Sequence, residues 1–164
     1  MRENLKDIYR VLTTDETLLR LLHYKPEDAN DDPLDVSKPN ILDMSDADKW
    51  GIINDKIVTT YKVTDLVDKD PKCRILFYPG RRSGTGNYMM ASQDIVIDVF
   101  VHMSFDIVDL RLSWICDRLS DLLFKKDVTG ANKMSFREGR NVRTNKDADS
   151  YVGYEMVYHF GSVN

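Results

Sequence analysis

One stretch of the sequence has a composition suited to anion binding, the glycine-rich run GRRSGTGN at residues 80–87. Glycine-rich loops bind phosphates because their backbone N–H groups can approach closely and a following helix adds positive potential. This run contains no GK[ST], and no helix is predicted directly after it, so the P-loop and dinucleotide-binding patterns do not apply. We interpret it as a hairpin tip whose guanidiniums, Arg81 and Arg82, contact a carboxylate-rich partner or a phosphate backbone. A solvated loop without a partner is the alternative.

The histidines and carboxylates show no catalytic or metal-binding spacing. His23, His102 and His159 are scattered, and none has a second metal ligand at the usual spacing, although the last two could meet on neighbouring strands. Asp94 and Asp98 share a predicted strand face but lie about 13 Å apart at ~3.3 Å per residue, too far for an acid–base pair. No GxSxG motif and no nucleophile–base constellation is visible. We therefore predict no enzyme activity, no cofactor and no metal.

Length and composition indicate one soluble domain spanning residues 1–164, with 42% apolar and 30% charged residues. The net charge of -4 argues against a dedicated nucleic-acid-binding protein. Cys73 and Cys116 lack CxxC spacing and are expected to be reduced core thiols. No apolar run approaches the roughly 18–20 residues of a membrane span, and the N-terminus lacks a signal peptide. We expect a protein of a reducing cytosol, unless it leaves as part of an assembly.

The strongest structural signal lies in residues 92–124. Apolar side chains alternate with period two over 92–103, which predicts a strand. Over 104–124 they recur every three to four residues, which predicts one long amphipathic helix capped by Ser104 or Asp106. The expected buried stripe of this helix consists of Val108, Leu112, Ile115, Leu119 and Leu122, widened by Ile107, Leu110, Trp114 and Leu123.

The remaining segments complete an α+β pattern. Residues 2–22 are predicted to form an N-terminal helix or two short helices. Further strands are expected at 72–78, 134–138 and 151–160, with a long hairpin tip over 79–91. In the last strand, one face should carry Val152, Tyr154, Met156, Tyr158 and Phe160. The prediction is a mostly antiparallel four-stranded sheet with helices packed on one face.

Residues 24–70 form an acidic insertion or loop region in this scheme. Its first part, 24–49, holds three of the five prolines and eight Asp or Glu residues, which forbid a continuous helix or central strand there. A short helix is expected over 46–58. A loop of this length is usually functional or partly disordered, and a solvated linker is the alternative.

Six residues are candidates for an assembly interface. Arg81, Arg82, Asn87 and Tyr88 belong to the predicted hairpin tip, and Tyr151 and Tyr154 belong to the closing strand. Aromatic side chains with a polar end suit subunit interfaces, and they suit ordinary strand faces equally well.

Four segments resemble, in order, the tail-terminator or tail-completion proteins of tailed bacteriophages: LKDIYRVLTTDETLLRLL, CRILFYPGRRS, QDIVIDVFVHMSFDIVDLRLSWICDRLSDLLF and YVGYEMVYHF. The first corresponds to an opening helix, the next two together to a hairpin and the helix that follows it, and the last to a closing strand. The acidic region 24–70 resembles an insertion. The resemblance implies a structural virion protein of the head–tail neck with no active site. Such proteins assemble in the host cytoplasm as rings, usually hexamers, that cap the tail tube and join it to the head connector.

In that setting DNA passes through the ring lumen without sequence-specific binding, and a modestly acidic ring limits sticking of the DNA backbone. The acidic loop and the arginine-bearing tip are expected to pair between neighbouring copies. Two alternatives remain. The chain could be another neck component, such as a head-completion or stopper protein. It could also be a small nucleic-acid-binding α+β module that uses Arg81, Arg82, Arg137, Arg140 and Arg143.

Overall fold

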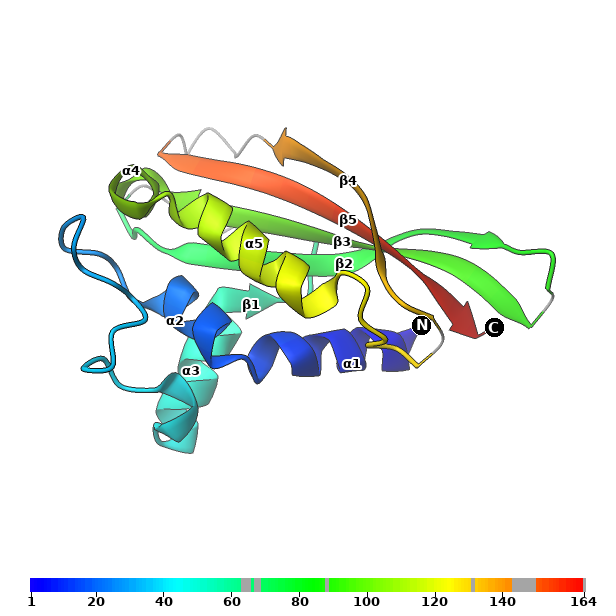
Figure 1. Ribbon diagram of the computed structural model, residues 1–164, viewed down its shortest axis with the longest axis horizontal. Coiled ribbons are helices and arrows are strands. Elements are labelled where there is room, and N and C mark those ends of the chain that lie inside the picture. Colours follow the sequence, from blue (N-terminus) through cyan, green and yellow to red (C-terminus); the bar gives the residue numbers. More distant parts are fainter. Residues whose placement is uncertain (63–65, 67–68, 88, 131, 143–149, 164) are drawn as a thin grey trace.

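The computed structural model describes residues 1–62, 66, 69–87, 89–130, 132–142 and 150–163, and shows a mixed sheet with helices on one face (Figure 1). The helices are α1 (Arg2–Thr13), α2 (Glu16–His23), α3 (Asp46–Lys56), α4 (Met103–Asp109) and α5 (Arg111–Leu123), with a 3₁₀ turn at Ile41–Asp43. The strands are β1 (Ile57–Val58), β2 (Cys73–Gly84), β3 (Met90–His102), β4 (Ser135–Val142) and β5 (Tyr151–Val163).

The strand order is β1-β2-β3-β5-β4. The last four strands pair antiparallel, whereas the two-residue β1 runs parallel to β2. The predicted α+β class is therefore confirmed, but the sheet has five strands and is mixed rather than four-stranded and antiparallel. Two residues of β1 are too short to produce a periodic signal, so the sequence pattern could not reveal this strand.

The main core lies between the sheet and the helices. Alternate side chains of β3, including Ile97 and Val99, face α1, α2 and α5 together with Phe77 of β2. On β5 the same core contains Met156, Tyr158 and Phe160, and Val152 and Tyr154 pack against it, as the alternation predicted. In the part of the chain that the structure describes, no helix covers the opposite face of the sheet, and we call it the open face (Figure 1).

The predicted helix over 104–124 is wrong in its continuity, because it is divided at Leu110. This residue adopts the left-handed conformation with φ of 54° and ψ of 41°. The side chain of Asp106 accepts a hydrogen bond from the backbone N–H of Leu112 at 2.8 Å and so caps the new helix α5. The break turns α4 away, leaving Ile107 74% and Leu110 69% exposed, so neither belongs to the buried stripe.

The predicted tip over 79–91 is also shorter than expected. Strand β2 continues to Gly84 and β3 begins at Met90. A register shift between Pro79 and Arg82 marks a bulge. A Cβ atom on Gly80 would lie 3.0 Å from the Val96 side chain, so glycine permits the close approach of the two strands there. The predicted short strand 134–138 is longer than expected, because β4 pairs with β5 from Ser135 to Val142.

The acidic segment 24–48, which ends in the first turn of α3, is ordered around a buried arginine rather than being a solvated linker. Arg20, 7% exposed, donates from Nε to the carbonyl oxygen of Pro33 at 3.1 Å and from Nη2 to that of Lys38 at 2.9 Å. Several aspartates cap their own turns, such as Asp32, which accepts from the backbone N–H of Leu34 at 2.7 Å. The expected short helix is confirmed as α3, and parts of 59–70 lie outside the described residues.

Candidate assembly surfaces

The distal parts of β2 and β3, residues 79–92, extend beyond the helical layer together with the end of β5, and we call this hairpin the arm (Figure 1). Arg81 and Arg82 lie on it and are exposed. Asn87 shapes the turn at its end, because its Oδ1 accepts from the backbone N–H of Met89 at 3.0 Å. Tyr88 lies outside the described residues. The structure therefore brings Arg81, Arg82 and Asn87 together on one projecting element.

The two candidate tyrosines of β5 lie on opposite faces of the sheet. Tyr151 is only 5% exposed on the open face, and its hydroxyl donates to the carbonyl oxygen of Asp70 at 2.6 Å. Its ring packs edge-on against His102, with 5.0 Å between ring centroids. Tyr151 thus holds the segment before β2 onto the sheet, whereas Tyr154 faces the helices and lines a groove.

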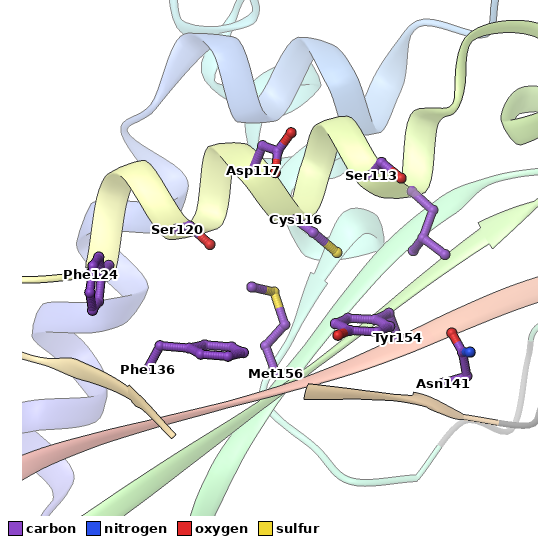
Figure 2. Close-up of a pocket in the computed structure, with 10 residues that line it drawn as sticks. Ser113, Cys116, Asp117, Ser120, Phe124, Phe136, Asn141, Tyr154 and Met156 are labelled. Carbon is purple, nitrogen blue, oxygen red and sulfur yellow. The ribbon is translucent and has the colours of Figure 1, made fainter. Parts of the chain in front are cut away.

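This groove runs between α5 and the sheet edge formed by β5 and β4, with a volume of about 570 Å³. Figure 2 shows Phe136, Met156 and Tyr154 directed from the strands toward Cys116 and Ser120 of α5. At the end of the groove, Phe124 is 41% exposed, and Phe136 is 43% exposed. An apolar groove beside an edge strand is typical of a protein-contact surface.

The open face carries a pair of opposed carboxylates. Asp98 of β3 lies directly across from Glu155 of β5. Tyr78 donates from its hydroxyl to Asp98 Oδ2 at 3.0 Å, and Arg140 Nε pairs with Glu155 Oε1 at 2.7 Å. The pKa of Asp98 is raised to about 6, mainly by burial and also by the Glu155 charge, whereas the Tyr78 hydrogen bond and the Arg140 charge oppose the shift.

A second polar cluster lies on the same face at the base of the arm. Ser92 Oγ is 3.2 Å from His159 Nε2, and His159 Nδ1 is 2.8 Å from Asp94 Oδ1. Arg137 Nη1 lies 2.5 Å from Asp94 Oδ2. These four residues and Arg81 line a cleft of about 440 Å³. Alternation in the sequence predicts which face of its own strand Asp94 or His159 occupies. It does not predict that the two residues pair directly across β3 and β5.

The sequence pattern of the YomW family matches residues 15–160, from before α2 to near the end of β5. A protein of Bacillus subtilis (strain 168), described as SPbeta prophage-derived uncharacterized protein YomW, is 31% identical over 169 residues. That alignment covers 98% of this chain and 96% of the relative. The chain belongs to the YomW family. The expected connection to bacteriophages is thus confirmed at the level of a prophage-derived relative.

The region that matches the family, residues 15–160, contains the arm, the groove and both open-face clusters. Cys73 and Cys116 are free, and burial raises the pKa of each thiol to about 12. Cys73 lies in the core, as expected, whereas Cys116 is half-buried and lines the groove. His102 faces Tyr151 and His159 faces Asp94 in the β3–β5 register, so the two histidines lie at opposite ends of the strand pair.

Within the described parts of the chain, no group of three or more His, Cys, Asp or Glu residues could hold a metal ion. Across the same residues, none of the helices has the length and apolar character that crossing a membrane requires. Of the arginines considered for nucleic-acid binding, Arg137 and Arg140 already pair with Asp94 and Glu155. Arg143 lies outside the described residues.

Proposed function

We propose that the protein is a structural component of the bacteriophage neck, a tail-terminator or tail-completion subunit. It forms a ring, a hexamer in the family it resembles, that caps the tail tube and joins it to the head connector while DNA passes through the lumen. The kinship with a prophage-derived protein supports a phage role. The observation that carries the proposal is the position of opposite charges at opposite ends of one subunit.

The cationic end is the arm, on which Arg81 and Arg82 are exposed. The acidic segment 24–48 lies at the other end of the molecule (Figure 1). Its exposed carboxylates are Glu27, Asp28, Asp32, Asp35, Asp43, Asp46 and Asp48. Complementary patches on opposite ends of a subunit favour head-to-tail contacts, and such heterologous contacts close into rings when the rotation between subunits permits.

The structural support for these two ends suits assembly. The acidic segment is held to the core by Arg20, so its carboxylates occupy fixed positions. The arm is a paired extension of β2 and β3, stiffened by the end of β5. Preformed surfaces bind with less ordering cost than disordered ones. The apolar groove containing Tyr154 is a second contact surface in this scheme, for a neighbouring subunit or the tail tube.

Ring formation is testable by native mass spectrometry and negative-stain microscopy of the purified protein, alone and with tail tubes. We expect six-fold rings, and we expect the double variant Arg81→Glu/Arg82→Glu to lose them, since it replaces two positive charges opposite the acidic segment with two negative ones. Lys6→Glu/Arg10→Glu is the matched control, because it changes the net charge equally at two exposed positions of α1 that lie outside both the arm and the acidic segment. Rings that survive the arm variant would contradict the contact, and particles without the protein at the neck would contradict the function.

A further inference from the structure

We propose that Ser92, His159 and Asp94 form a nucleophilic site that cleaves carboxylic esters, an activity separate from ring assembly. The hydroxyl, imidazole and carboxylate follow one another in the order that activates a serine, with hydrogen-bond distances of 3.2 Å and 2.8 Å. Three different side-chain types meet here because β3 and β5 are adjacent, with Asp94 directly opposite His159.

The carboxylate fixes the imidazole in the useful tautomer. Arg137 donates to Asp94 Oδ2, and His159 Nδ1 faces Asp94 Oδ1, so both carboxylate oxygens act as acceptors. In its neutral form His159 therefore carries the proton on Nδ1, facing Asp94, and presents an unprotonated Nε2 to Ser92. Nε2 then accepts the hydrogen bond of the Ser92 hydroxyl, which is the arrangement of a base beside a nucleophile.

Burial decreases from the carboxylate toward the cleft. The side chain of Asp94 is 7% exposed, and that of His159 is 38% exposed. Ser92 is half-buried and lines the 440 Å³ cleft. The orienting carboxylate is thus shielded from water, while the hydroxyl and Nε2 lie where a small substrate can enter.

The cleft determines the substrate class. Strand β3 pairs at Ser92 with Ser83 on one side and Gly161 on the other, so the backbone there belongs to the sheet ladder. Side chains must therefore stabilise the oxyanion, and Arg81 lines the same cleft with a permanent positive charge. With Arg81 and Arg137 on its walls, the cleft suits a short polar or anionic ester rather than a long apolar one.

The chemical steps balance with water as the only co-reactant. Ser92 Oγ attacks the ester carbonyl carbon while its proton passes to His159 Nε2, giving a tetrahedral oxyanion beside Arg81. When this intermediate collapses, the bond between the carbonyl carbon and the alkoxy oxygen breaks. The departing alcohol takes the proton from Nε2, and the acyl group remains on Ser92 Oγ. Water then attacks the acyl carbonyl carbon while Nε2 takes its proton. The bond from the acyl carbon to Ser92 Oγ breaks, Nε2 returns the proton to Oγ, and the carboxylic acid is released.

The test uses a fluorophosphonate probe, which forms a stable adduct with activated serines, followed by peptide mass spectrometry. We expect one adduct, on Ser92, and slow release of p-nitrophenol from p-nitrophenyl acetate. Labelling should be lost in Ser92→Ala and reduced about 100-fold in His159→Gln, because the base is removed. Ser113→Ala is the control, an exposed serine on α5 outside the cleft, and should label at the wild-type rate.

An unlabelled wild-type protein would overturn the proposal without any variant. An adduct that persists in Ser92→Ala would overturn it equally, since another residue would then react. Arg81→Gln should lower ester turnover about 100-fold with unchanged melting temperature, as loss of one oxyanion partner does elsewhere. Ring assembly should survive His159→Gln, so failure of the ester cleavage and failure of the neck role are separately visible.

Discussion

Arg111 Nη1 donates to the carbonyl oxygen of Leu21 at 2.6 Å, although the Arg111 side chain is completely buried. The same nitrogen lies 2.7 Å from the carbonyl oxygen of Tyr24, and Nε and Nη2 contact Asp109 Oδ2 at 2.9 and 2.5 Å. One guanidinium therefore joins the start of α5 to the end of α2, where the carbonyl groups have no partners within the helix. The acidic segment begins at this junction.

Arg111→Met should destabilise the fold by about 3–5 kcal/mol. The substitution keeps much of the side-chain volume but leaves Asp109 buried without its cation and two carbonyl groups without donors. The free energy of unfolding from urea titration measures this loss. Arg10→Met is the control, because Arg10 is exposed on α1 and its ion pair with Asp7 spans 3.6 Å. A change of less than about 0.5 kcal/mol is expected there, and equal losses in the two variants would contradict the role of Arg111.

Leu119→Ala should lower the free energy of unfolding by about 2–5 kcal/mol, because Leu119 is completely buried on the core-facing side of α5 and its truncation leaves a cavity. Ile107→Ala should change stability by about 0.5 kcal/mol or less, since that side chain is 74% exposed on α4. Thermal melting of both variants distinguishes the positions. If Ile107→Ala proves as damaging as Leu119→Ala, then Ile107 is buried and α4 packs differently.

Leu110→Gly should leave stability unchanged or raise it by up to about 1 kcal/mol. Leucine is strained at φ of 54°, and glycine adopts this conformation freely, although the unfolded chain gains entropy. The Leu110 side chain is exposed, so its removal loses little packing energy. Leu112→Gly is the comparison inside α5. It should be less stable than Leu112→Ala by about 1 kcal/mol, because glycine is a poorer helix former than alanine. A large loss at Leu110 in chemical unfolding would contradict the strain.

Periodicity predicted the elements well and their interruptions poorly. The alternation over 151–160 identified the core-facing residues of β5, because successive side chains of a strand point to opposite faces of the sheet. The break at Leu110 was missed because no glycine or proline marks it and because Asp106 caps the following helix through a side-chain bond. The length of β2 and β3 was missed because arginine, serine and glycine in 80–87 suggested a loop.

The clusters on the open face depended on register, which a single sequence does not contain. Asp98 and Glu155, like Asp94 and His159, become neighbours only through the pairing of β3 with β5. The buried arginines Arg20 and Arg111 were equally unpredictable, since each donates to backbone carbonyl groups that carry no residue-type signal. Of the candidate assembly surface, the composition of the sequence indicated only the positive charge of Arg81 and Arg82 on the arm.

Asp98→Asn should remove a pH dependence of stability between about pH 4 and 6. The pKa of Asp98 is raised to about 6, mainly by burial, so over this window the folded state holds a proton that the unfolded state has released. The wild-type free energy of unfolding should therefore fall as pH rises through the window.

Asparagine at position 98 carries no charge and keeps an acceptor for the Tyr78 hydroxyl, so the variant should be more stable than the wild type at pH 7 by roughly 1–3 kcal/mol. Urea unfolding at pH 4, 5, 6 and 7 measures both slopes, with Asp121→Asn on the exposed face of α5 as the control. An Asp98→Asn slope identical to that of the wild type would show that Asp98 is ionised throughout and that the open face is more hydrated than its burial indicates.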